Sequence, residues 1–382
     1  MWQRGFQLAI ATRFQGLRAL ALLVCLPLGL TAARAAPGDY FEQEVSVSDP
    51  LRAEQAQELQ SYIAAQKQDP ARLHALFKAD YSSERAYAHS AGPLRQAFAF
   101  SIGYPPPGPA PTDPPRFEPI GADAIGSYFR AFIPVVGGVH AEGIYIVPKG
   151  AKGKVPLVIA MHGGRGSPER ALFHGGANYH DMVRGGVKNG YAVFAPQHLF
   201  VAPGFPDDIR NQIDARLRLV GTSLTAIELA KISASLDVLL KRPEIDADRV
   251  AMVGLSYGGY YTLVTAALDQ RIKVAVSSGY FGIQEGRYAA SELSVPSDFQ
   301  FPDRFSLFRD PEIAALICPR ALEIQAGDHD DAEHREPGRL KIPQVAQYYE
   351  RLHRQSQFRY LLFNGNHEFH DASAWEFLRA HL

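Results

Sequence analysis

One serine lies in a sequence context that can make its hydroxyl reactive. The run Gly254-Leu255-Ser256-Tyr257-Gly258-Gly259 combines the end of an apolar stretch at 250–255 with the start of a helical pattern that continues over 260–268. Glycines two residues before and two after the serine leave room for a tight, strained turn that presents the hydroxyl at a helix N-terminus. Unpaired amides and the positive end of the helix dipole can stabilise an oxyanion there. The pattern predicts that Ser256 is a nucleophile, with a purely structural turn as the alternative.

A histidine that could act as the base for this serine follows the last apolar stretch of the chain. His367 comes just after residues 358–363, in the run Asn364-Gly365-Asn366-His367-Glu368-Phe369. A histidine at that place can reach the sheet edge where the nucleophile is expected. His370 is its rival, but we expect His370 to begin the final helix. We therefore predict His367 as the base.

The acid that would orient the histidine is less well defined. Asp328, Asp330 and Asp331 share the loop after the apolar stretch at 321–326, and Glu285 is a further carboxylate of the second half. A serine on a strand-to-helix turn is followed along the chain by its acid and then by its histidine, so an acid between Ser256 and His367 fits that order. The spacing of these residues does not by itself show which of the four carboxylates is the acid.

The loop that carries these aspartates also has the composition of a metal site, because it contains His329, Glu333 and His334 as well. Its carboxylates and histidines are crowded together, without the helical or paired spacing that lets ligands converge on one ion. We therefore expect no metal, and the serine chemistry needs no organic cofactor.

A second oxyanion donor is expected in the loop His162-Gly163-Gly164-Arg165-Gly166-Ser167, after the apolar stretch at 155–161. Glycines there let the backbone approach a substrate, so we assign the donors to the amides of Gly164 and Tyr257. Gly163 and His162 belong to the supporting loop, which His162 is expected to brace by hydrogen bonding. A phosphate-binding loop is the alternative, but its Gly-Lys-Ser or Gly-Lys-Thr ending is missing.

The elements that must position these residues form an alternation of short apolar strands and helices. We expect buried strands at 155–161, 192–196, 250–255, 272–277, 321–326 and 358–363. A strand pair around Gly137-Gly138 precedes them, and helices are expected at 222–240, with Thr225 to Glu228 in capping-box register, at 343–355 and at 372–381. This alternation predicts an α/β fold in which a mostly parallel central sheet has helices on both faces.

The chain divides into three predicted segments. Residues 1–35 have the arginines, short apolar run and small residues of a secretory signal peptide, and the run is too short to span a bilayer. Residues 36–116 are expected to form an N-terminal helical extension with a Pro-rich linker at 104–116, and residues 117–382 the catalytic domain. An insertion at 282–312 is expected above the carboxyl ends of the strands.

Two helices of the extension should open at Asp49-Pro50 and Asp69-Pro70, where an N-cap carboxylate precedes a proline. We expect both to pack on the main domain through apolar faces, formed by Leu51, Leu59, Tyr62 and Ile63 in the first and by Leu73, Leu76 and Phe77 in the second.

Composition and charge narrow the possible functions. The 382 residues are 46% apolar and 21% charged, as in a globular enzyme. Cleavage of the signal would remove four arginines and Cys25, leaving 35 basic and 40 acidic residues, a charge near −5 that does not attract nucleic acid. Cys318 would then be a single cysteine, expected as a small buried residue. The expected location is periplasmic or secreted, without stable membrane insertion, and the oligomeric state is not predicted.

These motifs together resemble the α/β-hydrolase superfamily, and in particular its acetyl xylan esterase-like and dienelactone hydrolase-like branch, which is similar to the catalytic domain of prolyl oligopeptidases. The resemblance covers about 120–382 and also includes Ser278-Gly279-Tyr280-Phe281. It implies that Ser256 is the nucleophile, His367 the base, and Asp330 the acid, because the family's acid usually stands three residues after the glycine. The short stretch ahead of the domain differs from the large propeller of true prolyl oligopeptidases.

The function expected from these residues is that of an exported serine esterase acting through an acyl-enzyme, without cofactors. By resemblance, its substrates would be acyl groups on a polysaccharide or small-molecule esters. A prolyl oligopeptidase-like peptidase and a non-catalytic binding protein with a hydrolase fold are the alternatives.

Overall fold

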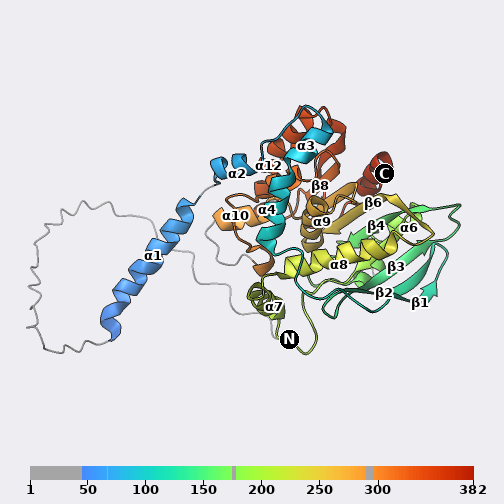
Figure 1. Cartoon of the computed structure of the whole chain (residues 1–382), viewed down its shortest axis with the longest axis horizontal. Coiled ribbons are helices and arrows are strands. Elements are labelled where there is room, and N and C mark those ends of the chain that lie inside the picture. The colour runs from blue at the N-terminus through green and yellow to red at the C-terminus, as the bar shows by residue number, and fades with distance from the viewer. Residues whose placement is uncertain (1–44, 67, 174–177, 290–295) are drawn as a thin grey trace, which may run out of the picture. The chain divides into compact units, whose positions relative to one another are not determined.

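The computed structural model describes residues 45–66, 68–173, 178–289 and 296–382 (Figure 1). The predicted signal peptide at 1–35, with Cys25, lies outside the described residues. The chain divides into two units, 1–59 and 60–382. The first unit contains η1 (Val45–Ser48) and the start of α1 (Asp49–Ala65), which begins at the predicted aspartate and ends in the second unit. Four apolar side chains of α1 are exposed, Leu51, Leu59, Tyr62 and Ile63. That this face packs on the main domain stays a prediction.

The second unit is built on a nine-stranded sheet with the order β1-β2-β3-β5-β4-β6-β7-β8-β9. The first three strands and β5 pair antiparallel, and the pairs from β5 to β9 are parallel. The strands are β1 (Arg116–Ala122), β2 (Gly126–Val136), β3 (Val139–Pro148), β4 (Val155–Met161), β5 (Ala192–Pro196), β6 (Ile245–Leu255), β7 (Val274–Ser278), β8 (Ala321–Gly327) and β9 (Phe358–Phe363). The mostly parallel sheet predicted from the sequence is confirmed.

Helices cover both faces of this sheet, so the unit has two hydrophobic cores. Alternate residues of β4 point to opposite faces: Leu157 and Ile159 belong to one core, and Val158 and Ala160 to the other. Helices α8 and α9 pack on the first face, and α8 can be followed across the sheet in Figure 1. The helices are α2 (Pro70–Leu76), α3 (Glu84–Ser90), α4 (Gly92–Ile102), α5 (Pro168–Phe173), α6 (Arg184–Lys188), α7 (Ile209–Arg218), α8 (Leu224–Leu239), α9 (Tyr257–Leu268), α10 (Ile283–Ala289), α11 (Asp310–Ala315), α12 (Ala332–Arg351) and α13 (Asp371–His381), with short 3-10 turns η2 (Ser297–Phe299) and η3 (Gln355–Gln357).

Three details differ from the sequence predictions. Strand β9 is only partly buried because it lies at the sheet edge, so it is not covered on both faces as expected. Helix α8 is capped by Ser223, whose side chain accepts from the amide of Ala226, and not by a box starting at Thr225. Helix α12 begins at Ala332, eleven residues before the predicted start, and has Pro337 and Pro343 within it.

The helical segment ahead of the sheet contains more than the predicted helix at Asp69-Pro70. Asp69 caps α2 by accepting from the amide of Arg72, as expected. Helices α3 and α4 were not predicted, although Tyr87 and Phe98 on them are fully buried. All three helices contribute to the core shared with α8 and α9. From α2 onward, the predicted extension is therefore part of the second unit and shares its core.

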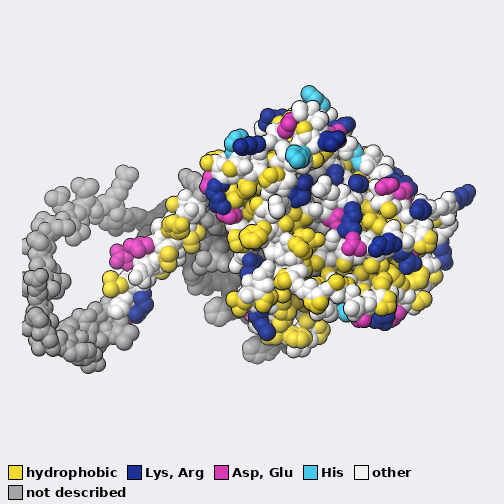
Figure 2. Space-filling model, in the orientation of Figure 1, with side chains coloured by type: hydrophobic (Ala, Val, Ile, Leu, Met, Phe, Trp, Pro, Cys, Tyr) yellow, Lys and Arg dark blue, Asp and Glu magenta, His cyan; other side chains and the backbone are white. Residues whose placement is uncertain are grey.

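The surface carries both signs of charge. On the face shown in Figure 2, basic and acidic side chains are interspersed, with apolar patches between them. None of the helices among the described residues is long and apolar enough to cross a membrane.

Candidate active site

Ser256 forms the strained turn between β6 and α9 that its motif predicts. Its backbone has φ +58° and ψ −117°, a conformation that L-residues rarely adopt. A Cβ at Gly254 would lie 2.2 Å from the carbonyl oxygen of Gly258, and one at Gly258 would lie 2.0 Å from that of Met161. Both glycines are therefore required by contact with backbone, and the serine is held at the N-terminus of α9.

The predicted base and one of the candidate acids meet at the ends of β8 and β9. Asp330 Oδ2 lies 2.7 Å from His367 Nδ1, and the aspartate side chain is 5% exposed against 31% for the histidine. Such a contact fixes the ring and leaves Nε2 directed to another partner. The other candidate acids make different contacts: Asp328 accepts from the amide of Gly365, and Glu285 accepts from the amide of Asp310.

The histidine and serine loops approach each other around the end of β7. A Cβ at Gly279 would lie 3.0 Å from His367 Cε1, so the ring rests on the backbone that follows β7. The amide of Ser256 bonds the carbonyl of Ser278, the residue before this glycine. His370, the rival base, lies at the N-cap of α13, where its Nδ1 accepts from the amide of Ser373, in line with the predicted helix start.

The loop after β4 lies directly beside the serine. A Cβ at Gly163 would approach Ser256 Cβ to 3.3 Å. The amide of Gly163 donates to the hydroxyl of Tyr179 at 2.8 Å, whereas the Gly164 amide donates to no acceptor within the described chain. Of these two glycines, Gly164 therefore retains an amide that can serve a substrate oxygen. The ring of Phe200 covers the other side of this glycine, 2.9 Å from where a Cβ would stand.

His162 lies under this loop with a second histidine that the sequence analysis did not single out. The two rings, His162 and His198, stack at 4.1 Å, and both side chains are buried. His198 Nε2 lies 3.0 Å from the carbonyl of His162, and His162 Nδ1 lies 2.8 Å from that of Gly163. Burial lowers the pKa of His162 well below its usual value, and burial together with the charge of Arg210 lowers the pKa of His198 to about 3. The pair is thus neutral and braces the loop.

A pocket of about 620 Å³ opens beside Tyr257, the residue after the serine. Its lining residues are Phe200, Asp207, Asp208, Arg210, Asn211, Ala215, Tyr257, Pro296, Ser297 and Gln300. They come from the loop after β5, from α7 and from the insertion at 282–312, of which residues 290–295 lie outside the described chain. The sequence analysis missed the contribution of α7, because an amphipathic surface helix carries no motif.

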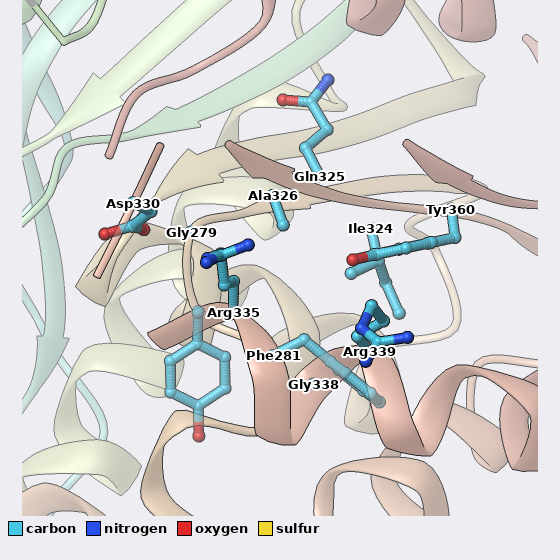
Figure 3. A pocket seen from close by; sticks show the side chains of 11 residues that line it. Gly279, Phe281, Ile324, Gln325, Ala326, Asp330, Arg335, Gly338, Arg339 and Tyr360 are labelled. Atoms are coloured by element: carbon cyan, nitrogen blue, oxygen red, sulfur yellow. The ribbon is translucent and has the colours of Figure 1, made fainter. Parts of the chain in front are cut away.

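A second cavity, of about 10 Å³, lies behind the acid. Figure 3 shows Asp330 at one end and Tyr360 with Arg339 at the other. Its volume leaves room for about one water molecule, too little for a substrate. Of these two cavities, only the larger has room for a small molecule, and it borders Tyr257, the residue after Ser256.

The other residues singled out from the sequence are Cys318 and members of the alternative metal set. Cys318 is buried, as predicted, and its burial raises the pKa of the thiol to about 12, so it stays protonated. The side chains of Glu333 and His334, part of the alternative metal set, lie outside the described structure.

Sheet topology and the serine turn together define the fold class: the chain has the α/β-hydrolase fold. The family model of the dienelactone hydrolase family matches residues 142–303, from β3 to the insertion. This segment includes the serine turn and the loop after β4, and the histidine loop lies beyond it.

Known proteins with similar sequences match this chain over only part of their length. YtaP of Bacillus subtilis, named as a hydrolase, is 27% identical over 202 residues, which are 50% of this chain and 65% of that protein. Hydrolase LUC6 of a Fusarium species is 31% identical over 155 residues, 40% of this chain and 33% of that protein. The chain thus spans less than two thirds of either relative.

Solved structures with the same fold are more distant in sequence. A Bacteroides fragilis protein described as an acetyl xylan esterase is similar with a TM-score of 0.64 and 14% identity, over 86% of this chain and 84% of that one. A glucuronoyl esterase from Solibacter usitatus has a TM-score of 0.56 and 14% identity, over 78% of this chain and 94% of that one. At 14% identity, these similarities show a shared fold and do not extend to a shared activity.

Proposed function

We propose that this protein is a serine hydrolase that cleaves carboxylic esters through an acyl-enzyme. The observation that carries the proposal is the contact of 2.7 Å between His367 Nδ1 and Asp330 Oδ2, beside a serine with φ +58° at a helix N-terminus. A fold that only binds ligands needs neither the strained serine nor the oriented histidine.

Each residue of the proposed site has a separate role in the reaction. His367, oriented by Asp330 through Nδ1, takes the proton of Ser256 as Oγ attacks the ester carbonyl. The amides of Gly164 and Tyr257 stabilise the oxyanion that forms. The imidazolium then gives its proton to the departing alcohol, and water repeats the sequence on the acyl-enzyme to release the acid and free the serine. No metal or organic cofactor takes part in this scheme.

The substrate class is the less constrained part of the proposal. A pocket of about 620 Å³ with aromatic, amide and carboxylate side chains suits a polar alcohol or acyl group on a small ester or a polysaccharide. Names of proteins with a similar fold, an acetyl xylan esterase and a glucuronoyl esterase, support such substrates. Export through the signal sequence at 1–35 is part of the proposal and is supported by the sequence alone.

Labelling with a fluorophosphonate probe tests the nucleophile. We expect the protein to react at Ser256, as located by peptide mass spectrometry, and the Ser256→Ala variant to fold but neither react nor turn over esters. A folded protein that does not label, or a labelled Ser256→Ala variant, would contradict the proposed nucleophile. Rates on acetyl, feruloyl and peptidyl substrates then separate an esterase from a prolyl oligopeptidase-like peptidase.

A further inference from the structure

Arg210 is a buried cation that borders the pocket beside Tyr257, and the steps proposed for ester hydrolysis assign it no role. It stands in the first turn of α7, is 4% exposed, and forms an ion pair with the fully buried Asp298. Tyr261 joins the pair, because its hydroxyl accepts from Arg210 Nη2 at 3.2 Å and donates to Asp298 Oδ2 at 2.7 Å. Burying two charges is costly even when they are paired, so this pair calls for an explanation beyond stability.

The guanidinium lies against the rings of two residues beside the serine. Its Cζ is 4.0 Å from the ring centroid of Tyr257 and 5.1 Å from that of Phe200. Its Nε and Nη1 are buried and have no hydrogen-bond partner among the described residues. The part of the cation that is not bound by Asp298 and Tyr261 is thus directed to aromatic faces, an arrangement that a planar cation favours.

Each of these rings belongs to, or covers, a proposed oxyanion donor. Tyr257 supplies one amide itself. Phe200 packs on Gly164, the other donor, and its ring meets the ring of Tyr257 edge to face at 5.0 Å. The guanidinium therefore contacts both of the side chains that fix where the two amides lie.

Asp298 is itself anchored to the helices behind the site. Its carbonyl oxygen accepts from the hydroxyls of Tyr260 on α9 and Thr225 on α8, at 3.1 and 3.0 Å. The ion pair consequently connects the surface helix α7 to the helix that begins at the serine.

We propose that Arg210, held by Asp298, is a positioning residue of the oxyanion hole. By packing on the rings of Tyr257 and Phe200, it keeps the amides of Tyr257 and Gly164 aimed at the same substrate oxygen. The inference depends on the proposed ester hydrolysis and adds to it a residue that touches no reacting atom.

The test compares Arg210→Met with Arg218→Met in the full chain, on an acetyl ester that the unaltered protein hydrolyses. Arg218 is the control on the same helix: it pairs with the buried Asp214, its Nη2 donates to the carbonyl of Ser297 beside Asp298, and it is not among the cations over Tyr257. We expect Arg210→Met to lower kcat by about 10- to 100-fold, since loss of one oxyanion donor costs about 100- to 1,000-fold. Its KM should stay within about twofold, and Arg218→Met, which loosens the same segment without touching the rings, should lower kcat by less than about threefold.

A double-mutant cycle with Tyr257→Leu distinguishes positioning from a general effect on folding. If Arg210 acts through the ring, Arg210→Met should lower kcat by less than about twofold once the ring is gone. Affinity for a boronic acid, which mimics the tetrahedral oxyanion, should fall in parallel with kcat/KM in Arg210→Met. A rise in KM alone, an equal effect of Arg218→Met, or additive effects in the cycle would each overturn the proposal.

If Arg210→Met does not fold, Arg210→Lys tests instead whether the guanidinium positions the oxyanion donors. Lysine retains the charge but not the planar fork, so we expect a kcat between those of the unaltered protein and the Tyr257→Leu variant. An unchanged kcat in a folded Arg210→Lys protein would contradict positioning by the guanidinium. Failure of the proposed function itself looks different, because the unaltered protein would then neither react with a fluorophosphonate at Ser256 nor hydrolyse the ester.

Discussion

The backbone amide of Ser256 donates a 2.8 Å hydrogen bond to the carbonyl oxygen of Ser278. Ser278 is the last residue of β7, and its hydroxyl donates to the carbonyl of Glu368, the residue after His367. One strand end thus connects the serine turn to the histidine loop. Because β7 is buried along its whole length, the separation of these two loops is set by the sheet.

Replacement of the proposed acid, Asp330, should lower turnover far more than replacement of its neighbour Asp328. We expect Asp330→Asn to lower kcat by about 1,000- to 10,000-fold, because an amide there no longer favours the working tautomer of His367. Asp328→Asn is the control: it perturbs the bond to the Gly365 amide and should cost less than about tenfold, since it leaves the Asp330 contact in place. Steady-state rates on one ester decide, and a larger loss in Asp328→Asn would assign the acid to Asp328 instead.

A methyl group added at Gly279, against the ring of His367, should lower kcat strongly and the free energy of unfolding only slightly. Gly279 has φ +59°, and a Cβ there would lie 3.0 Å from His367 Cε1, so Gly279→Ala should push the ring away. Gly138→Ala in the β2–β3 turn is the matched control, with φ +85° and open space around the added Cβ. Both variants should lose about 1 kcal/mol of unfolding free energy from backbone strain. Only Gly279→Ala should lower kcat, by at least about tenfold; equal activities would show that the ring adapts.

The central strands of the sheet were predictable because they are buried. Strands β4 and β5 have the predicted bounds, since continuous apolar runs between turns leave little choice of ends. The edge strand β9, which is only partly buried, also has the predicted bounds. Helices α3 and α4 were missed because they are short and adjacent, and their buried residues contact segments distant in the sequence, such as Phe98 with Phe301 and Phe308. Packing of that kind leaves no local periodic signal.

The site was predictable only where a motif dictates backbone geometry. Glycines on both sides of Ser256 indicate a strained turn, and the structure has φ +58° there. Nothing in the sequence pairs Arg210 with Asp298, 88 positions apart, or stacks His198 on His162. Those contacts depend on how the loop after β5 and the insertion fold over the sheet, and a single sequence does not encode loop placement in a local pattern.

Loss of a buried ring in the N-terminal extension should weaken the insertion that lines the pocket. Phe98 on α4 is fully buried and lies 5.7 and 5.5 Å from the rings of Phe301 and Phe308. We expect Phe98→Ala to lower the free energy of unfolding by about 3–5 kcal/mol. Arg72→Ala, which removes the exposed ion pair with Asp303, is the control and should cost no more than about 1 kcal/mol. Urea unfolding measures both, and equal losses would mean that the extension is held by its surface contacts.

The buried histidine pair should make the protein sensitive to acid. The pKa values of His162 and His198 in the folded protein lie below their usual value, the latter at about 3, so the unfolded chain takes up protons first as the pH falls. Stability from these neutral rings is therefore complete above about pH 6.5 and decreases below it, by roughly 1.4 kcal/mol per pH unit for each histidine. Urea unfolding at pH 7.5, 5.5 and 4.5 should reveal this slope.

A variant that removes one titrating ring should reduce that slope. We expect His198→Gln to lower stability at pH 7.5, because the stacked pair is lost, but to lose about 1.4 kcal/mol less per pH unit on acidification below pH 6.5. An unaltered slope in folded His198→Gln protein would mean that His198 is not kept neutral by burial, and that acid sensitivity arises elsewhere in the chain.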